Sequence, residues 1–135
     1  MKESSFQLTG KPKVTKISYE SNEQYVFKDE LVLELNNNIQ VIKSNEKERR
    51  ESIVILNVGI FTLKDISFVP FQINIEIEGR FKWDDKLEGT PEILEIMLKQ
   101  NAPAVLYSYL RPIITLITVE GNMPPLVIPL VNFCE

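Results

Sequence analysis

Residues 70–83, with the sequence PFQINIEIEGRFKW, carry the strongest structural signal in this chain. Aromatic and aliphatic side chains alternate there with polar and charged ones from Phe71 to Glu78. This period of two is typical of an antiparallel strand with one face in a core and the other toward solvent. A shift by one residue would exchange the two faces, so the pattern also determines the register of the strand.

Two further segments show weaker forms of the same pattern. In residues 13–20, Val14 is out of step with Ile17 and Tyr19, so the alternation is interrupted. Residues 51–65 are apolar at both odd and even positions, which is typical of a strand covered on both faces. We expect both segments to be strands of the same sheet as residues 70–83.

Residues 29–43 supply a fourth strand. Leucines occupy its alternate positions from Leu31 to Leu35, and the three asparagines at 36–38 indicate a bulge or bend. The following segment, 43–52, is rich in charges of both signs. Mixed charges of this kind favour a solvent-exposed hairpin loop over a nucleic-acid patch.

After Trp83 the pattern becomes helical. Thr90 and Pro91 provide a typical N-cap and first-turn residue. Residues 101–103, Asn-Ala-Pro, are expected to end this helix and begin a second one, because Pro103 disfavours helical geometry at the residue before it. The second helix is expected to run to about Glu120, with Gly121 as its C-cap.

Four strands followed by two helices predict an α+β fold, with a four-stranded antiparallel sheet and helices packed on one face. The length of 135 residues fits a single domain over 1–135. Asp84 and Asp85 resemble a divalent-metal pair, but beside Trp83 and Lys86 they favour a turn.

The composition excludes several classes of chemistry. The chain has no histidine, and its one cysteine is Cys134. Ser-His-Asp and Cys-His nucleophile systems, His/Cys zinc sites and intrachain disulfides are therefore ruled out. We expect no catalytic residues, no metal and no cofactor.

The charge and hydropathy of the chain bear on its location and partners. A net charge of −4 argues against nucleic acid as a partner. The N-terminus lacks the apolar core of a signal peptide. The most apolar stretch, Val105–Val119, is shorter than the roughly 20 residues of a membrane span and contains polar residues. We expect a soluble, cytoplasmic protein without membrane insertion.

Residues 101–121 form a helix that is apolar nearly all round. Its polar residues are spaced by three, four and three positions and form one narrow stripe: Ser108, Arg111, Thr115 and Thr118. One small sheet covers one apolar side, which leaves a second side for another subunit. The alternative is that the proline-rich C-terminal segment folds over that side. Pro112 should bend the helix, and we assign it no function.

Residues 102–133 resemble the signature region of SecB, the bacterial protein-export chaperone. The shared pattern is Pro-x-x-Leu-x-x-Tyr at the start of a long helix, followed by a Gly/Pro-rich segment that ends in Val-Asn-Phe. The matching residues are Pro103, Leu106, Tyr109, Arg111, Gly121, Pro124, Leu126, Pro129, Val131, Asn132 and Phe133, with Leu130 as a departure. Residues 6–20 and 75–81 are similar to the first and fourth strands of the family.

The resemblance implies an ATP-independent holdase, without catalysis or cofactor, that binds unfolded polypeptides in apolar grooves. It also implies a homotetramer built as a dimer of dimers. The expected oligomer interface combines the fourth strand with the apolar helix: Phe71, Ile73, Ile75, Ile77, Leu106, Tyr109, Leu110, Ile113 and Ile117. The expected groove consists of residues in apolar runs at the sheet–helix junction: Phe6, Leu8, Phe81, Trp83, Leu126, Val127 and Ile128.

The chain departs from the family where members dock the export ATPase SecA. Two acidic family positions are Lys16 and Asn74 here, which leaves Glu20, Glu76 and Glu78 as the candidate docking residues. Electrostatic docking is sensitive to such exchanges, so the residues leave SecA binding open. Family members also continue past Asn-Phe into a further helix and an acidic tail. These departures resemble SecB-like proteins dedicated to one client, such as an antitoxin of a toxin–antitoxin system.

Two alternatives to a holdase remain at this point. One is a structural oligomerisation module, which shares all the apolar evidence and differs only in binding no client. The other is an acyl-binding enzyme of the hot-dog type. In this chain, however, the central helix follows the strands and carries no acidic residue before Glu120.

Overall fold

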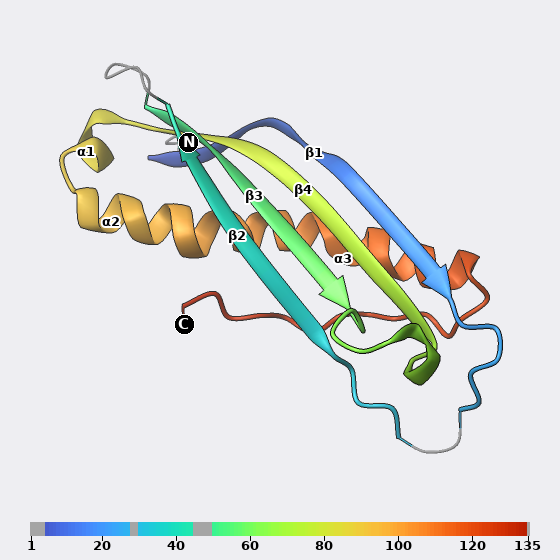
Figure 1. The fold of residues 1–135 in the computed structure, drawn as a ribbon. Helices are drawn as coiled ribbons and strands as arrows, with labels where there is room; N and C mark the ends of the chain where they lie inside the picture. Colours follow the sequence, from blue (N-terminus) through green and yellow to red (C-terminus); the bar gives the residue numbers. More distant parts are fainter. Residues whose placement is uncertain (1–4, 28–29, 45–49, 135) are drawn as a thin grey trace.

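The computed structural model describes residues 5–27, 30–44 and 50–134. A four-stranded, fully antiparallel sheet has the order β1-β4-β3-β2, and every α-helix follows the last strand, while one short 3₁₀ segment precedes it (Figure 1). The predicted α+β class and the order of strands before helices are confirmed. The strands are β1 (Phe6–Ser21), β2 (Leu35–Lys43), β3 (Glu51–Ile60) and β4 (Phe71–Trp83). The helical segments are η1 (Ile66–Phe68), α1 (Asp85–Glu88), α2 (Pro91–Ile96), η2 (Met97–Asn101) and α3 (Ala102–Glu120).

The alternation that predicts β4 is confirmed by the packing. Its apolar residues Phe71, Ile73, Ile75 and Ile77 are at most 5% exposed and lie under the long helix. The intervening polar residues are half-buried on the opposite, open face of the sheet. In β3 the residues that face the helix are fully buried as well, from Val54 to Ile60 at alternate positions.

β1 is longer than the alternation at 13–20 predicts, agrees with the first strand expected at 6–20 from the resemblance, and contains two irregularities. Its register against β4 shifts between Thr9 and Lys13, where Gly10 has a φ of 73°, and again between Val14 and Lys16. The second shift explains why Val14 is out of step with Ile17 in the sequence. A bulge inserts extra residues into one strand and reverses the apparent alternation on either side of it.

β2 is shorter and more regular than the sequence predicts. The bulge expected at the three asparagines is wrong, because the register against β3 is continuous from Leu35 to Lys43. The strand begins only at Leu35, so Leu31 and Leu33 precede it. Part of the predicted strand start and of the predicted charged loop, residues 28–29 and 45–49, lies outside the described residues. β2 is an edge strand, and its asparagines can keep water contacts there that a central strand would deny them.

The helix break expected at residues 101–103 is also wrong. Ala102 has helical geometry, with φ −61° and ψ −48°, and α2, η2 and α3 form one continuous helical run. The Ala102 N–H donates to the carbonyl of Met97, five residues back, so η2 is a π-helical turn. The wider turn accommodates Pro103, whose ring would crowd the carbonyl four residues back in a regular α-helix.

The predicted start of the first helix and the predicted end of the second are correct in position but differ in cause. Thr90 precedes α2 without capping it, because its hydroxyl donates to the Lys86 and Leu87 carbonyls instead. Gly121 ends α3 with a negative φ, and a side chain there would collide with the buried hydroxyl of Tyr19. Asp84 caps α1 by accepting from the Leu87 N–H at 3.0 Å, which lowers the pKa of its carboxyl. The turn interpretation of Asp84-Asp85 is therefore replaced by a helix cap.

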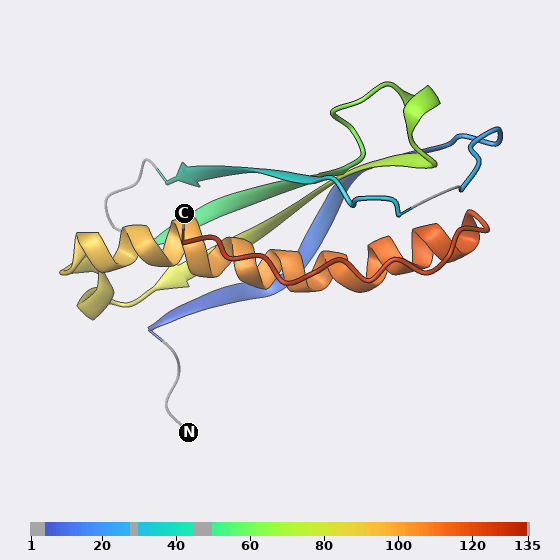
Figure 2. The same cartoon turned by 90° about the horizontal axis from the view of Figure 1, so that it is seen from below.

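The continuous run Pro91–Glu120 is long and apolar enough to cross a membrane, which Val105–Val119 alone is not. Its inner side, however, is fully buried against the sheet at Leu98, Leu106 and Ile114. The core helix of a globular domain has the same length and composition. Beyond Gly121 the chain turns back and runs along α3 in the opposite direction (Figure 2). We call residues 123–134 the C-terminal strap.

Candidate functional site

The side of α3 that faces the sheet contains residues that the sequence assigned to an oligomer interface. Leu106 and Leu110 are fully buried there, against a core that also contains Phe71, Ile73, Ile75 and Ile77. These six side chains have no surface left for a second chain. The direct-contact interpretation is corrected for them: they hold the helix on the sheet.

The polar stripe of α3 binds the C-terminal strap. Arg111 Nε donates to the Ile128 carbonyl at 3.0 Å, and Thr115 Oγ1 donates to the Leu126 carbonyl at 2.6 Å. The Leu126 N–H donates in turn to Thr118 Oγ1 at 3.0 Å. Side chains on the helix thus provide hydrogen-bond partners for main-chain groups of the strap. The strap covers the polar stripe from Arg111 to Thr118, leaving Ser108 exposed, and it leaves the second apolar side of the helix uncovered.

The uncovered side of α3 is a regular apolar row, which we call the open stripe. Its residues are spaced by four, three, four and three positions: Val105, Tyr109, Pro112, Leu116 and Val119. The four large side chains are between 38% and 59% exposed. Of the predicted interface residues, only Tyr109 belongs to this row, while Ile113 and Ile117 flank it half-buried. This spacing was visible in the sequence and could have predicted that Leu116 and Val119 belong to the open stripe.

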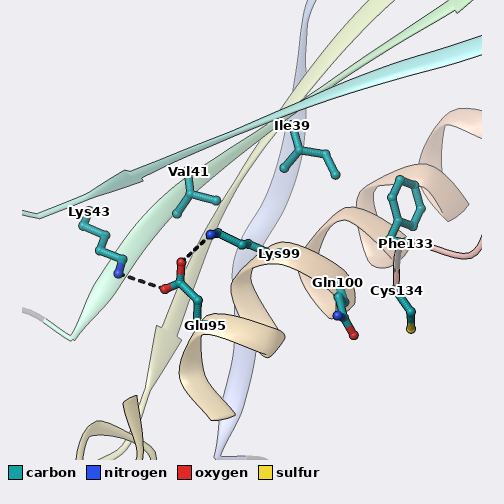
Figure 3. Close-up of a pocket in the computed structure, with 8 residues that line it drawn as sticks. All are labelled: Ile39, Val41, Lys43, Glu95, Lys99, Gln100, Phe133 and Cys134. Atoms are coloured by element: carbon teal, nitrogen blue, oxygen red, sulfur yellow. Dashed lines mark hydrogen bonds and ion pairs between the residues drawn. The ribbon is translucent and has the colours of Figure 1, made fainter. Parts of the chain in front are cut away.

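A cleft of about 720 Å³ opens between β2, the α2–η2 part of the helix and the end of the strap (Figure 3). We call it the β2 cleft. Ile39 and Val41 point into it from β2, and Phe133 faces them from the strap. The complete lining is Ile39, Val41, Lys43, Glu95, Lys99, Gln100, Phe133 and Cys134.

An ion-pair triad closes one end of the β2 cleft. The Glu95 carboxylate accepts from Lys99 Nζ at 2.8 Å and from Lys43 Nζ at 3.1 Å (Figure 3). The hydrogen bond from Lys99, and then that from Lys43, lowers the pKa of Glu95. The triad connects β2 to the helix at this end of the cleft.

A second, smaller hollow of about 190 Å³ lies at the start of the strap. Its walls are apolar: Phe27, Leu31, Leu33, Phe61, Pro70, Phe71, Met123, Pro124, Pro125 and Leu126. Around it the connections between strands expose further large apolar side chains, including Val32 at 82% and Phe68 at 71%. The segment before β2 and the connection before β4 thus carry exposed apolar side chains.

The seven predicted groove residues do not come together. Phe6, Leu8, Phe81 and Trp83 are cross-strand partners where β1 begins and β4 ends, and Phe6 stacks on Phe81 with ring centroids 5.3 Å apart. The other three lie on the strap: Leu126 in the small hollow, Val127 exposed and Ile128 fully buried. Three cleft residues, Ile39, Val41 and Phe133, were not predicted from the sequence. The alternation of Ile39 and Val41 and the Val-Asn-Phe motif that ends in Phe133 were visible in the sequence. Whether these side chains line an open cleft depends on where the strap ends.

The candidate SecA-docking residues lie on the open face of the sheet. Across the strands, Glu76 is opposite Lys16 and Glu78 is opposite Lys13, while Glu20 is opposite the neutral Gln72. Two of the three carboxylates thus have a lysine as cross-strand neighbour, which offsets their charge. Arg80 and Glu51 form an ion pair at 3.3 Å on the same face. This face carries mixed charges.

A family model described as preprotein translocase subunit SecB matches residues 2–135. The chain belongs to the SecB family. SecB proteins are soluble chaperones and not enzymes, so the prediction of a non-enzymatic protein is confirmed by the family. The hot-dog alternative is thereby set aside. Among the described residues, no group of three potential metal ligands is present.

Two further proteins resemble this SecB family member. The uncharacterized protein MJ0357 of Methanocaldococcus jannaschii is 31% identical over 107 residues, which are 78% of this chain and 66% of that protein. The chain thus spans slightly less than two thirds of its length. The Rv1957 SecB-like chaperone of Mycobacterium tuberculosis, solved with a ChAD peptide from the HigA1 antitoxin, shares the fold with a TM-score of 0.70 at 15% identity. That match covers 95% of this chain and 88% of the other.

Proposed function

We propose that this SecB family protein is an ATP-independent holdase that binds unfolded polypeptides, and that the β2 cleft is its main binding site. The observation that carries this proposal is an open apolar cleft, with Ile39, Val41 and Phe133 as its walls, beside further exposed apolar surface. Burial of one client leucine or phenylalanine side chain stabilises a complex by roughly 1.5–3 kcal/mol. Several such anchors offset the cost of ordering a disordered client.

A matched pair of variants tests this assignment. Val41→Asn places an amide in the cleft, whereas Ile42→Asn makes a similar change at the next residue, on the opposite face of β2. We expect the wild-type protein and Ile42→Asn to suppress aggregation of a chemically unfolded model protein, and Val41→Asn to suppress it several-fold less. Equal loss in both variants would contradict the cleft. Absence of suppression by the wild-type protein would favour the structural oligomerisation module.

We further propose a dedicated client, such as an antitoxin, over a general role in SecA-dependent export. The mixed charges around Glu76 and Glu78 support this, because an acidic docking surface needs uncompensated carboxylates. The Mycobacterium tuberculosis chaperone, which shares the fold, was solved with a peptide from an antitoxin, and this supports the proposal. Light scattering with and without SecA tests the proposal: a SecA complex of defined mass would overturn it. A toxin and an antitoxin encoded beside this protein would support it.

The open stripe supports the proposal of a homo-oligomer, with a dimer of dimers as the arrangement implied by the family resemblance. An exposed apolar row on a long helix is the type of surface that a second copy covers around a two-fold axis. We also propose that residues 1–135 act as one domain and that the protein works in the cytoplasm. Sedimentation equilibrium over a range of concentrations measures the oligomeric state.

A further inference from the structure

The open face of the sheet, away from the helix, divides into a neutral half and a charged half. Apart from Glu51 at its start, the residues that β2 and β3 direct to this face are neutral: Asn36, Asn38, Gln40, Ile42, Ile53, Ile55 and Asn57. The charged residues gather near the end of the sheet where β1 begins and β4 ends. Five cations accompany three carboxylates there: Lys11, Lys13, Lys16, Arg80 and Lys82 against Glu51, Glu76 and Glu78. This end is therefore basic, although the chain has a net charge of −4.

A bulge in β1 opens a hollow in the charged half. Thr9 pairs with Arg80 and Lys13 pairs with Glu78, so three residues of β1 lie opposite one residue of β4. The first of the three, Gly10, has a φ of 73°, which favours glycine. The hollow has a volume of about 310 Å³, and we call it the bulge hollow. Its lining is Thr9, Lys11, Lys13, Ile53, Glu78, Gly79 and Arg80.

The positive charge at the bulge hollow is only partly offset within the protein. The lining contains three cations and one carboxylate. Of the nearby carboxylates, Glu76 accepts a hydrogen bond from Thr15 Oγ1 at 2.8 Å, and Glu51 accepts one from Arg80 Nη1 at 3.3 Å. All three lysines of β1 are exposed, and none of them forms an ion pair with another described residue. An anion from outside the chain would find these lysines available.

The arrangement of the lysines fits several carboxylates in a row better than one small anion. Lys11, Lys13 and Lys16 follow a single strand, and at about 3.3 Å per residue they extend over roughly 15 Å. A phosphate ion would contact only part of this row. An extended peptide has the same rise per residue, so acidic side chains at every second or third position match it. Ile53 and Ile55 beside the row provide apolar contacts for the rest of such a peptide.

Nucleic acid fits this surface less well. Proteins that bind single strands stack the bases on aromatic side chains, and the residues that we assign to the open face are all non-aromatic. The neighbouring carboxylates and the net charge of −4 would also repel the dense charge of a phosphate backbone. The sparse charge of an acidic peptide avoids most of that repulsion.

We propose that the bulge hollow and the lysine row of β1 form a docking site for an acidic peptide segment of a partner protein. One carboxylate of the segment occupies the hollow between Lys11, Lys13 and Arg80, and another lies against Lys16. Charge-assisted hydrogen bonds from lysine and arginine to carboxylates are stronger than neutral ones. The site is separate from the β2 cleft, because β1 and β2 are opposite edges of the sheet and the cleft lies on the helix side. It does not depend on the proposed holdase function.

Fluorescence anisotropy with two labelled peptides tests the charge requirement. The probe is a ten-residue peptide in which glutamate alternates with serine, and its control has glutamine at every glutamate position. We expect the wild-type protein to bind the acidic peptide at least tenfold more tightly than the control. The affinity should fall several-fold as NaCl rises from about 50 to about 500 mM, because salt screens exposed charges. Equal affinity for the two peptides would overturn the proposal.

Matched double variants locate the site. Lys11→Gln with Lys13→Gln removes two charges at the bulge hollow, whereas Lys64→Gln with Lys86→Gln removes two exposed charges elsewhere. We expect the first pair to weaken binding of the acidic peptide roughly tenfold and the second pair to stay within twofold. Lys11→Arg with Lys13→Arg should keep most of the affinity, since both charges remain. Equal losses in the two glutamine pairs would show a diffuse effect of net charge and would overturn the site.

Three further measurements exclude other sites and ligands. Val41→Asn, in the β2 cleft, should bind the acidic peptide like the wild type; a loss as large as that of Lys11→Gln with Lys13→Gln would place the peptide in the cleft instead. An oligothymidine of ten nucleotides that binds as tightly as the peptide would overturn the assignment to an acidic peptide. Inorganic phosphate that displaces the peptide at the same concentration of anionic groups would overturn it as well. Suppression of aggregation is measured separately, so this site and the holdase function can fail independently.

Discussion

The open stripe of α3 and the β2 cleft are both apolar and exposed, but they differ in their main chain. Within the open stripe the backbone is helical, so almost all of its polar groups are already bonded inside the helix. Beside the cleft, the outer edge of β2 has main-chain groups directed outward. The first surface can interact through side chains alone, whereas the second can also bond to an extended chain.

This difference indicates what kind of partner each surface fits. The spacing of four, three, four and three residues from Val105 to Val119 is the spacing found where one helix packs against another. A folded second copy provides such a helix, and an unfolded client does not. A strand edge beside an apolar cleft fits an unfolded segment, whose own main chain has no partner. Exposed hydrophobicity alone would not separate the two roles.

The largest expected effect follows a charge placed in the open stripe. Leu116 is 59% exposed, and Leu116→Glu would bury a carboxylate in each copy of a helix-to-helix interface. Because an uncompensated buried charge costs about 3–5 kcal/mol, we expect self-association to weaken at least a hundredfold, as measured by analytical ultracentrifugation. Leu63→Glu, at an exposed leucine in a loop, is the control and should leave the mass unchanged. Client affinity per chain should stay within twofold; a parallel loss of client binding would contradict two separate surfaces.

A smaller effect is expected from Phe133→Ala, which acts on the cleft and not on the stripe. The Phe133 ring packs edge-on against the Tyr107 ring, with ring centroids 5.8 Å apart, and it forms one wall of the cleft. Its loss should weaken client binding roughly tenfold, because the client loses one large apolar contact. Phe133→Leu should retain most of the affinity. Isothermal titration measures both variants, and ultracentrifugation should show an unchanged oligomer; a change in mass would show that the two surfaces are coupled.

A third prediction concerns the attachment of the strap to α3. It compares the free energy of unfolding of two variants of the polar stripe. Thr118→Val keeps the shape of the side chain but leaves the Leu126 N–H without its acceptor. A buried donor without a partner costs about 1–3 kcal/mol, so urea denaturation should show a loss of that size. Ser108→Ala, which removes an exposed hydroxyl from the same helix, should stay within about 0.5 kcal/mol. If both variants were equally stable, the strap would not depend on the polar stripe.

The sheet was predictable from the sequence, and the cleft was not. The alternation from Phe71 to Glu78 determined β4 and its register, because one face of a strand must be apolar when it meets a core. The polar stripe of α3 was also visible. Its role was not, because the partners of Arg111 and Thr115 are main-chain carbonyls of the strap, and carbonyls occur at every residue.

The missed residues share one physical cause. Ile39 and Val41 were visible as an apolar pair in a strand, but they line a cleft only because the strap ends at Phe133 and Cys134 beside them. The same uncertainty led to the opposite error at Leu106 and Leu110, which were assigned to an interface and are fully buried. A sequence pattern shows which side of an element is apolar. It does not show which of several apolar segments covers that side.

The smallest expected difference between the two surfaces concerns pH. Glu95 at the mouth of the cleft has its pKa lowered from the ordinary value of 4.5 by Lys99 and Lys43, whereas the open stripe contains no carboxylate. A lowered pKa means that the native state favours the charged form. The resulting stabilisation is present above pH 4.5 and disappears as the pH falls through the lowered pKa. Since Glu95 is 42% exposed, solvent screening keeps this contribution small.

Comparison of Glu95→Gln with the wild type isolates this contribution from the other carboxylates. The variant should melt slightly below the wild type at pH 7, and the two melting temperatures should converge toward pH 3, as measured by differential scanning calorimetry. The oligomer masses of the two proteins should respond identically to pH. A difference in melting temperature that persists unchanged at pH 3 would show that Glu95 acts through packing. In that case the ion-pair triad would not stabilise the protein electrostatically.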